Sequence, residues 1–153
     1  MDQVYDVDKK SYLIRLTKPN TKKVLFIESG CRFHTTVFEW PKGSSKIYEL
    51  EIRNYISILT YIVICLAPSG FTMKLRKHLA NKRLENISQV GVDRVVDFQF
   101  GENAFEFHIF LELYDKGNII LTDQSRSILS LVRPHGQGEE KYVNTSNKIV
   151  QLV

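Results

Sequence analysis

Cysteine is scarce in this sequence, and its scarcity excludes a disulfide-stapled domain. The 153 residues include two cysteines, Cys31 and Cys65, which do not form the closely spaced pairs of zinc or redox sites. The amino terminus also lacks the basic and apolar regions of a secretory signal peptide. We therefore expect an intracellular protein in a reducing compartment.

Long apolar runs are absent as well. Residues 55–67 form the most apolar stretch, but they fall short of the roughly 20 residues that a membrane-spanning helix needs. A buried strand or helix is the simpler interpretation, and the segment is an aggregation hazard if neither forms. The sequence thus predicts no membrane partner.

The motifs of common enzymes are missing too. No nucleophile elbow, phosphate loop or HExxH string is present. Cys31 and His34 would point to opposite faces of a regular strand, which makes them a poor pair of metal ligands. The sequence therefore predicts neither an enzyme nor a cofactor or metal site.

What the chain does contain suits one folded domain. Of its residues, 43% are apolar and 25% are charged, close to the average of globular domains, and the length fits a single core. Lys and Arg outnumber Asp and Glu by 21 to 17, a formal charge of +4. Because that excess favours a polyanionic partner only weakly, the distribution of charge matters more.

Strand patterns open the chain and return at its end. Four strands rich in β-branched and aromatic residues are expected first, at residues 4–7, 12–16, 24–28 and 31–37. A helical pattern follows from Ser69, its expected cap, to near Arg83. Strands return from Arg94, with further ones at residues 105–114, 119–121 and 128–132. This order predicts an α+β fold of antiparallel β-meander sheets with one basic helix.

The expected helix and its exit carry a run of basic residues and no acidic one. The basic side chains there are Lys74, Arg76, Lys77, Lys82 and Arg83. A concentrated cationic surface of this kind suits phosphate, although an ordinary solvated helix face accounts for it at least as well.

Two smaller patterns also involve charge. Arg32, His34 and Thr36 share one face of an expected strand, where they could follow a sugar-phosphate backbone or simply form the solvent face of a sheet. Asp93 and Arg94 precede another strand. Such a dipeptide is usually a local ion pair, so by itself it indicates little about function.

Several longer strings occur in an order and spacing found in one protein family. They include SYLIRLTKP at 11–19, ESGCRFHTTVFEWPK at 28–42, PSGFTMKLRKHL at 68–79, GVDRVVDFQFG at 91–101 and ELYDKGNIILTD at 112–123. Together they resemble the NFACT-N domain of the nuclear export mediator factor (NEMF) family, eukaryotic ribosome-associated quality-control factors related to bacterial RqcH. The resemblance covers most of the chain outside residues 43–66 and the tail.

The resemblance implies a fold similar to the N-terminal domain of formamidopyrimidine-DNA glycosylases, without their amino-terminal Pro-Glu. It implies a cytoplasmic factor, with the nucleus as a second compartment, that binds tRNA and the large ribosomal subunit at stalled peptidyl-tRNA complexes. It also implies support for carboxy-terminal tailing of nascent chains, and recruitment of a listerin-type ubiquitin ligase through regions outside this sequence. By position in the family's strings, the RNA-binding residues would be Asp93, Arg94, Arg32, His34, Lys74, Arg76, Lys77 and His78.

The chain departs from the family pattern in three places. It starts after the family's usual first helix and strand, residues 43–66 stand where the family has a short loop, and the polar tail at 134–153 diverges. We therefore expect a partial NFACT-N domain at 1–133 and a mobile tail, with the insert held at the periphery by the chain breakers Pro41 and Pro68. The alternatives are an incomplete, non-functional fragment or isoform and, more remotely, a glycosylase-like DNA-binding enzyme.

Overall fold

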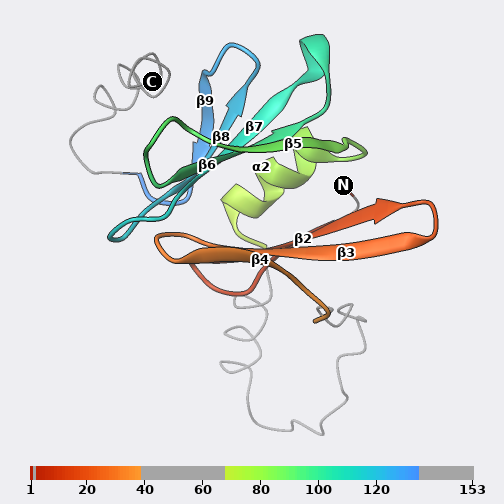
Figure 1. Ribbon diagram of the computed structural model, residues 1–153, viewed down its shortest axis with the longest axis horizontal. Helices are drawn as coiled ribbons and strands as arrows, with labels where there is room; N and C mark the ends of the chain where they lie inside the picture. Colours follow the sequence, from red (N-terminus) through yellow and green to blue (C-terminus); the bar gives the residue numbers. More distant parts are fainter. Residues whose placement is uncertain (2, 39–67, 135–153) are drawn as a thin grey trace, which may run out of the picture.

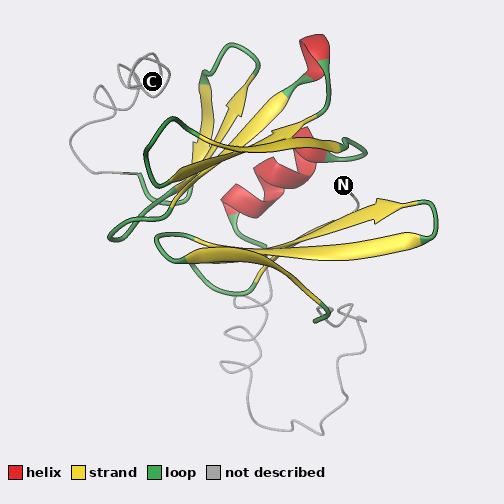
Figure 2. Cartoon of the chain, viewed as in Figure 1, coloured by secondary structure: helices red, strands yellow, loops and turns green. Residues whose placement is uncertain are grey.

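The structure, a computed structural model, describes residues 1, 3–38 and 68–134. These residues form two antiparallel sheets and one α-helix (Figures 1 and 2). The strand order is β1-β2-β3-β4 in the first sheet and β5-β6-β7-β8-β9 in the second. Because neighbours in each sheet are also neighbours in sequence, both sheets are meanders, and the predicted α+β fold is confirmed.

The element bounds follow the expected pattern closely in the first half of the chain. The first sheet contains β1 (Gln3–Asp6), β2 (Ser11–Lys18), β3 (Thr21–Glu28) and β4 (Arg32–Thr36). The helix α2 (Gly70–Leu79) comes next. The second sheet contains β5 (Leu84–Gln89), β6 (Val95–Phe100), β7 (Phe107–Glu112), β8 (Ile119–Asp123) and β9 (Ile128–Leu131), with a short 3₁₀ helix η1 (Asn103–Phe105) before β7.

The start of α2 was predicted correctly and its end was not. Ser69 caps the helix, because its Oγ accepts a hydrogen bond from the backbone N of Thr72 at 3.2 Å. The helix ends at Leu79 rather than near Arg83, because Asn81 adopts a left-handed φ of 60° and interrupts the helical hydrogen-bond pattern. The residues that follow form β5, a strand that the sequence analysis did not anticipate.

The core lies between the two sheets, and α2 occupies the space where they diverge (Figure 1). Phe33 of β4 packs edge-on against Phe98 of β6, with ring centroids 5.3 Å apart, where the sheets approach each other. From the helix, Phe71, Leu75 and Leu79 are buried in the same cluster. Burying these apolar faces against one another is the main stabilising contribution to the fold.

The alternating stretch at residues 105–114 forms a shorter strand than expected. Phe105 belongs to η1 and is 72% exposed, and β7 begins at Phe107. Both faces of β7 are buried: Ile109 and Leu111 pack in the main core, and Phe110 belongs to a second cluster on the other face.

Two expectations concern segments outside the described residues, namely the insert at 43–66 and the tail beyond Pro134. The elements that flank the insert, β4 and α2, occupy the places expected for them. Among the described residues, no helix is long and apolar enough to cross a membrane.

Candidate nucleic-acid interface

Asp93 and Arg94 lie in the exposed turn between β5 and β6. The Asp93 carboxylate accepts a hydrogen bond from the backbone N of Arg94 at 2.6 Å, and the Gln89 side chain donates to the Asp93 carbonyl at 2.8 Å. The Arg94 guanidinium lies over the Tyr114 ring, 5.9 Å from its centroid. Asp93 therefore shapes the turn through the backbone, and the aromatic ring of Tyr114 supports the arginine side chain.

A tight contact between two turns joins the sheets near this site. The backbone N of Gly30, between β3 and β4, donates to the carbonyl of Glu112 at 2.9 Å. A Cβ atom on Gly117 would lie 2.4 Å from the same Gly30 nitrogen, so only glycine fits there. Ser29 Oγ also donates to the Lys116 carbonyl at 3.2 Å.

That contact places the two smaller charged patterns at one end of the molecule. Leu113, next to Glu112 in the chain, donates to the carbonyl of Arg94 at 2.8 Å. Figure 1 shows the β3–β4, β5–β6 and β7–β8 turns gathered at this end. The Asp93–Arg94 turn and the first residue of β4, Arg32, therefore belong to neighbouring parts of one surface.

Arg32 and His34 both lie on exposed positions of β4, as predicted. Glu28 pairs with two cations, Arg32 at 3.0 Å and Lys10 at 2.9 Å, and its side chain is only 12% exposed. The hydrogen bond from Lys10 holds the pKa of the Glu28 carboxyl below its ordinary value, and Arg32 adds to the effect. Two cations around one carboxylate leave the site with a net positive charge.

Two basic side chains of the helix contact backbone carbonyls, so the cationic surface predicted from its sequence would not consist of free side chains alone. Lys74 Nζ donates to the Leu129 carbonyl of β9 at 2.9 Å, whereas Arg76 donates from Nε and Nη2 to the Val4 carbonyl of β1 at 2.9 and 2.7 Å. These side chains thus diverge toward different sheets and satisfy backbone carbonyls. Lys77 is exposed.

His78, in the last turn of α2, packs against the Phe107 ring, with ring centroids 5.2 Å apart. Burial lowers the pKa of His78, and the neighbouring charges of Lys77, Lys74 and Lys82 lower it further. The imidazole is therefore predominantly neutral at neutral pH. The last turn of α2 leads into the start of β5, whereas the β5–β6 turn follows the end of that strand, so the two turns lie at opposite ends of β5 (Figure 1).

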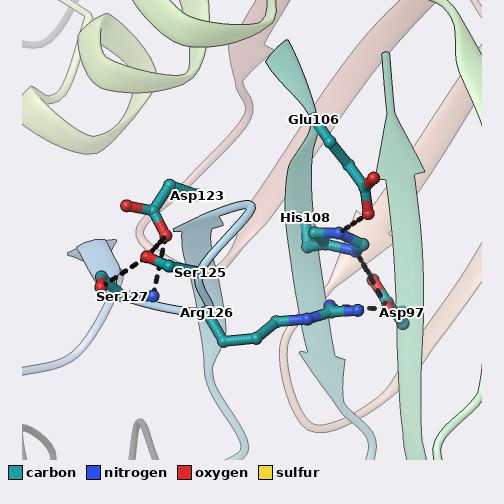
Figure 3. Close-up of polar contacts among 7 residues, drawn as sticks. All are labelled: Asp97, Glu106, His108, Asp123, Ser125, Arg126 and Ser127. Atoms are coloured by element: carbon teal, nitrogen blue, oxygen red, sulfur yellow. Dashed lines mark hydrogen bonds and ion pairs between the residues drawn. The ribbon is translucent and has the colours of Figure 1, made fainter. Parts of the chain in front are cut away.

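One polar network in the described part of the chain involves residues that the sequence analysis did not assign to a site (Figure 3). His108, 1% exposed, sits between two carboxylates: its Nδ1 is 2.8 Å from Asp97 Oδ1, and its Nε2 contacts Glu106 Oε1. Arg126 Nη1 donates to Asp97 Oδ2 at 3.1 Å. Both ring nitrogens of His108 therefore face carboxylate oxygens.

This network stabilises the second sheet by joining its strands through side chains. Ser125, the nearby hydroxyl in Figure 3, donates to Asp123 at 2.7 Å rather than to His108, so the arrangement is not a nucleophile and its base. Within residues 1, 3–38 and 68–134, no group of three or more His, Cys, Asp or Glu side chains could hold a metal ion. The only sequence signal for the network was a histidine in an otherwise apolar strand.

A cleft of about 940 Å³ lies beside the N-terminus of α2. The backbone N of Ser69 there already donates to Asp6 Oδ2 at 2.7 Å. Since a carboxylate of the protein itself occupies the place an anion would take, this cleft is a poor phosphate site.

Residues 65–144 match the model of the family described as NFACT N-terminal and middle domains, and the chain belongs to this family. It is 50% identical over 141 residues to the Drosophila melanogaster ribosome quality control complex subunit NEMF homolog, covering 91% of this chain and 12% of that protein. It is 47% identical over 133 residues to human ribosome quality control complex subunit NEMF, covering 87% of this chain and 10% of that protein. The chain therefore spans about a tenth of the length of these relatives.

A solved structure shares the fold. The N-terminal domain of the fibronectin-binding protein PavA from Streptococcus pneumoniae superimposes with a TM-score of 0.65 at 19% identity, covering 92% of this chain and 49% of that one. At this identity the likeness concerns the fold alone. The likeness is to this bacterial N-terminal domain and not specifically to the glycosylases that the resemblance implied.

Proposed function

We propose that this chain is an RNA-binding domain of a ribosome-associated quality-control factor, which binds tRNA and the large ribosomal subunit without catalysing a reaction. Its membership of the NFACT family and its similarity to quality-control subunits support this assignment. The site of action would be the stalled peptidyl-tRNA complex in the cytoplasm. Support of carboxy-terminal tailing, and contact with a listerin-type ligase through other regions, belong to the same proposal.

The observation that carries the proposal is the Asp93–Arg94 turn. Its arginine is exposed and supported by Tyr114, and its backbone is fixed by hydrogen bonds to Gln89 and Leu113. A guanidinium held in this way can donate to a phosphate or a base edge without losing much conformational freedom on binding. Asp93 keeps the turn in shape and need not contact RNA.

The β4 positions Arg32 and His34 extend this surface, because the Gly30–Gly117 contact holds the two sheets together next to it. Lys77 is the exposed cation that the helix would contribute, whereas Lys74 and Arg76 first stabilise the fold through the carbonyls of Leu129 and Val4. We expect His78 to contribute packing rather than charge.

Fluorescence anisotropy with a labelled, deacylated tRNA tests the proposal. Arg94→Gln is expected to weaken binding about tenfold and to reduce the salt dependence by about one phosphate contact. Lys18→Gln is the control, since Lys18 is also exposed but lies outside the turn and outside the basic run of the helix. Equal binding by the two variants would show that the turn is not the contact surface.

A further inference from the structure

The outer face of the first sheet carries two neighbouring aromatic side chains, Phe26 and His34, with Leu13 beside them; we call these three side chains the aromatic row. The strand register pairs Leu13 with Phe26 and Phe26 with His34, so the three side chains lie side by side across β2, β3 and β4. Their chain neighbours Ile14 and Ile27 are buried in the core between the sheets. Because side chains alternate along a strand, the row faces away from the core and the helix.

The groups in this row are held in fixed orientations. The rings of Phe26 and His34 are 5.2 Å apart and tilted by 34°, and the Arg32 guanidinium lies over Phe26 at 5.5 Å. His34 Nδ1 lies 3.1 Å from the Thr35 carbonyl, which can only accept, so Nδ1 carries a proton and the ring is oriented. Arg32 is oriented by its Nε contact with Glu28 at 3.0 Å.

These residues line an open groove of about 230 Å³, with Leu13 at its base and Thr36 and Phe38 at its margin. That volume is below the roughly 300–1,000 Å³ of pockets that enclose a small molecule. A groove of this size suits a single ring system of a ligand, while the rest of the ligand stays outside the groove. Phe38, 54% exposed, extends the aromatic surface at the margin.

We propose that this groove binds a single unpaired nucleotide of RNA, with its base against the aromatic row and its phosphate on Arg32. The inference rests on the proposed function and adds that the β4 surface binds an unpaired nucleotide of the RNA. Unpaired bases stack on phenylalanine, histidine and arginine planes, and arginine donates to phosphate in a planar fork. A base inside a duplex is already stacked, so a duplex does not satisfy this site.

The test uses the full chain and two labelled probes of equal phosphate number, hexauridylate and an abasic hexamer. Hexauridylate is expected to bind about tenfold more tightly than the abasic hexamer, which keeps the charge and lacks the bases. Phe26→Leu should weaken hexauridylate binding about tenfold, and Phe105→Leu, which changes an exposed phenylalanine elsewhere, should not.

A second pair of variants tests what the charge of Arg32 contributes to binding. Arg32→Gln is expected to weaken hexauridylate binding about fivefold or more, whereas Lys22→Gln, at an exposed position near the other end of β3, should change it less than twofold. With the unaltered protein, a photoactivated 4-thiouridine hexamer should crosslink to β4. This last measurement decides the question even if a variant folds poorly.

Equal affinity for the abasic hexamer, or a crosslink confined to the Asp93–Arg94 turn, overturns the nucleotide site. These outcomes are separate from failure of the proposed function. If Phe26→Leu has no effect on hexauridylate while Arg94→Gln still weakens tRNA binding, the groove is wrong and the RNA-binding role stands. If the hexamer crosslinks to β4 while Arg94→Gln binds tRNA normally, the assigned contact turn is wrong and the groove stands.

Discussion

Replacement of His108 by phenylalanine tests the physical basis of the second sheet. The substitution keeps a ring of similar size but removes both ring nitrogens, of which Nδ1 faces Asp97 and Nε2 faces Glu106. Breaking a buried ionic contact by removing one partner costs about 3–5 kcal/mol. The Asp97 side chain is 12% exposed and keeps Arg126, and the Glu106 side chain is 21% exposed, so both retain some other stabilisation. We therefore expect a loss near the lower limit, about 3 kcal/mol.

Urea unfolding followed by far-UV circular dichroism measures this loss. With a denaturant dependence of about 2 kcal/mol per molar urea, the midpoint of His108→Phe should fall by about 1.5 M. His34→Phe makes the same chemical change at an exposed position and should alter stability by less than about 0.5 kcal/mol.

A double-mutant cycle with Asp97→Ala separates the ionic contact from packing. If the imidazole binds Asp97 as a cation, the two substitutions should couple by about 2 kcal/mol. A loss below about 1 kcal/mol for His108→Phe, or additive effects in the cycle, would refute the reasoning and indicate that the histidine acts as a neutral core side chain.

Two further predictions concern Gly117, at the contact between the two sheets, and Glu28, at the end of β3 near that contact. Gly117→Ala should destabilise the protein by more than about 2 kcal/mol, because the new Cβ would meet backbone atoms of Gly30 at 2.4–2.6 Å and Gly117 has a φ of +54°. Gly70→Ala is the control, since nothing lies within 4 Å of the position of its Cβ, and a thermal melt compares the two. Glu28→Gln should reduce the loss of stability on acidification. The pKa of Glu28 is lower in the folded state than its ordinary value of 4.5, so the ionised carboxylate stabilises the fold at pH values above 4.5. That contribution disappears as the pH falls through the folded-state pKa. Urea midpoints at a series of pH values measure it, and an unchanged pH profile in the variant would contradict the assignment.

The sequence predicted elements well where local patterns were strong. The hairpins of the first sheet have turn residues between apolar runs, and Ser69 caps the helix as expected. It failed at β5, whose side chains are mostly exposed and therefore show no apolar alternation. The end of the helix was also missed, because the left-handed conformation of Asn81 has no strong signature in a single sequence.

The site could be predicted as a set of residues but not as an arrangement. Charge runs identify Lys74 and Arg76, yet whether a long cation points to solvent or to a backbone carbonyl depends on strands distant in sequence. The His108 network was similarly hidden, since Asp97, Arg126 and the histidine meet only after three hairpins have formed. The roles of Lys74 and Arg76 in RNA binding stay predictions.

The back-to-back turns at Gly30 and Gly117 have a consequence for the order of folding. Every strand pair within each sheet joins segments close in sequence, so the hairpins can close quickly and with little loss of loop entropy. The hydrogen bond between Ser29 and Lys116, by contrast, spans 87 positions. We expect docking of the two meanders through these turns to be the slow, late step, and contacts made after the transition state act mainly on the unfolding rate. The junction would therefore determine how long a folded molecule lasts more than how quickly it forms.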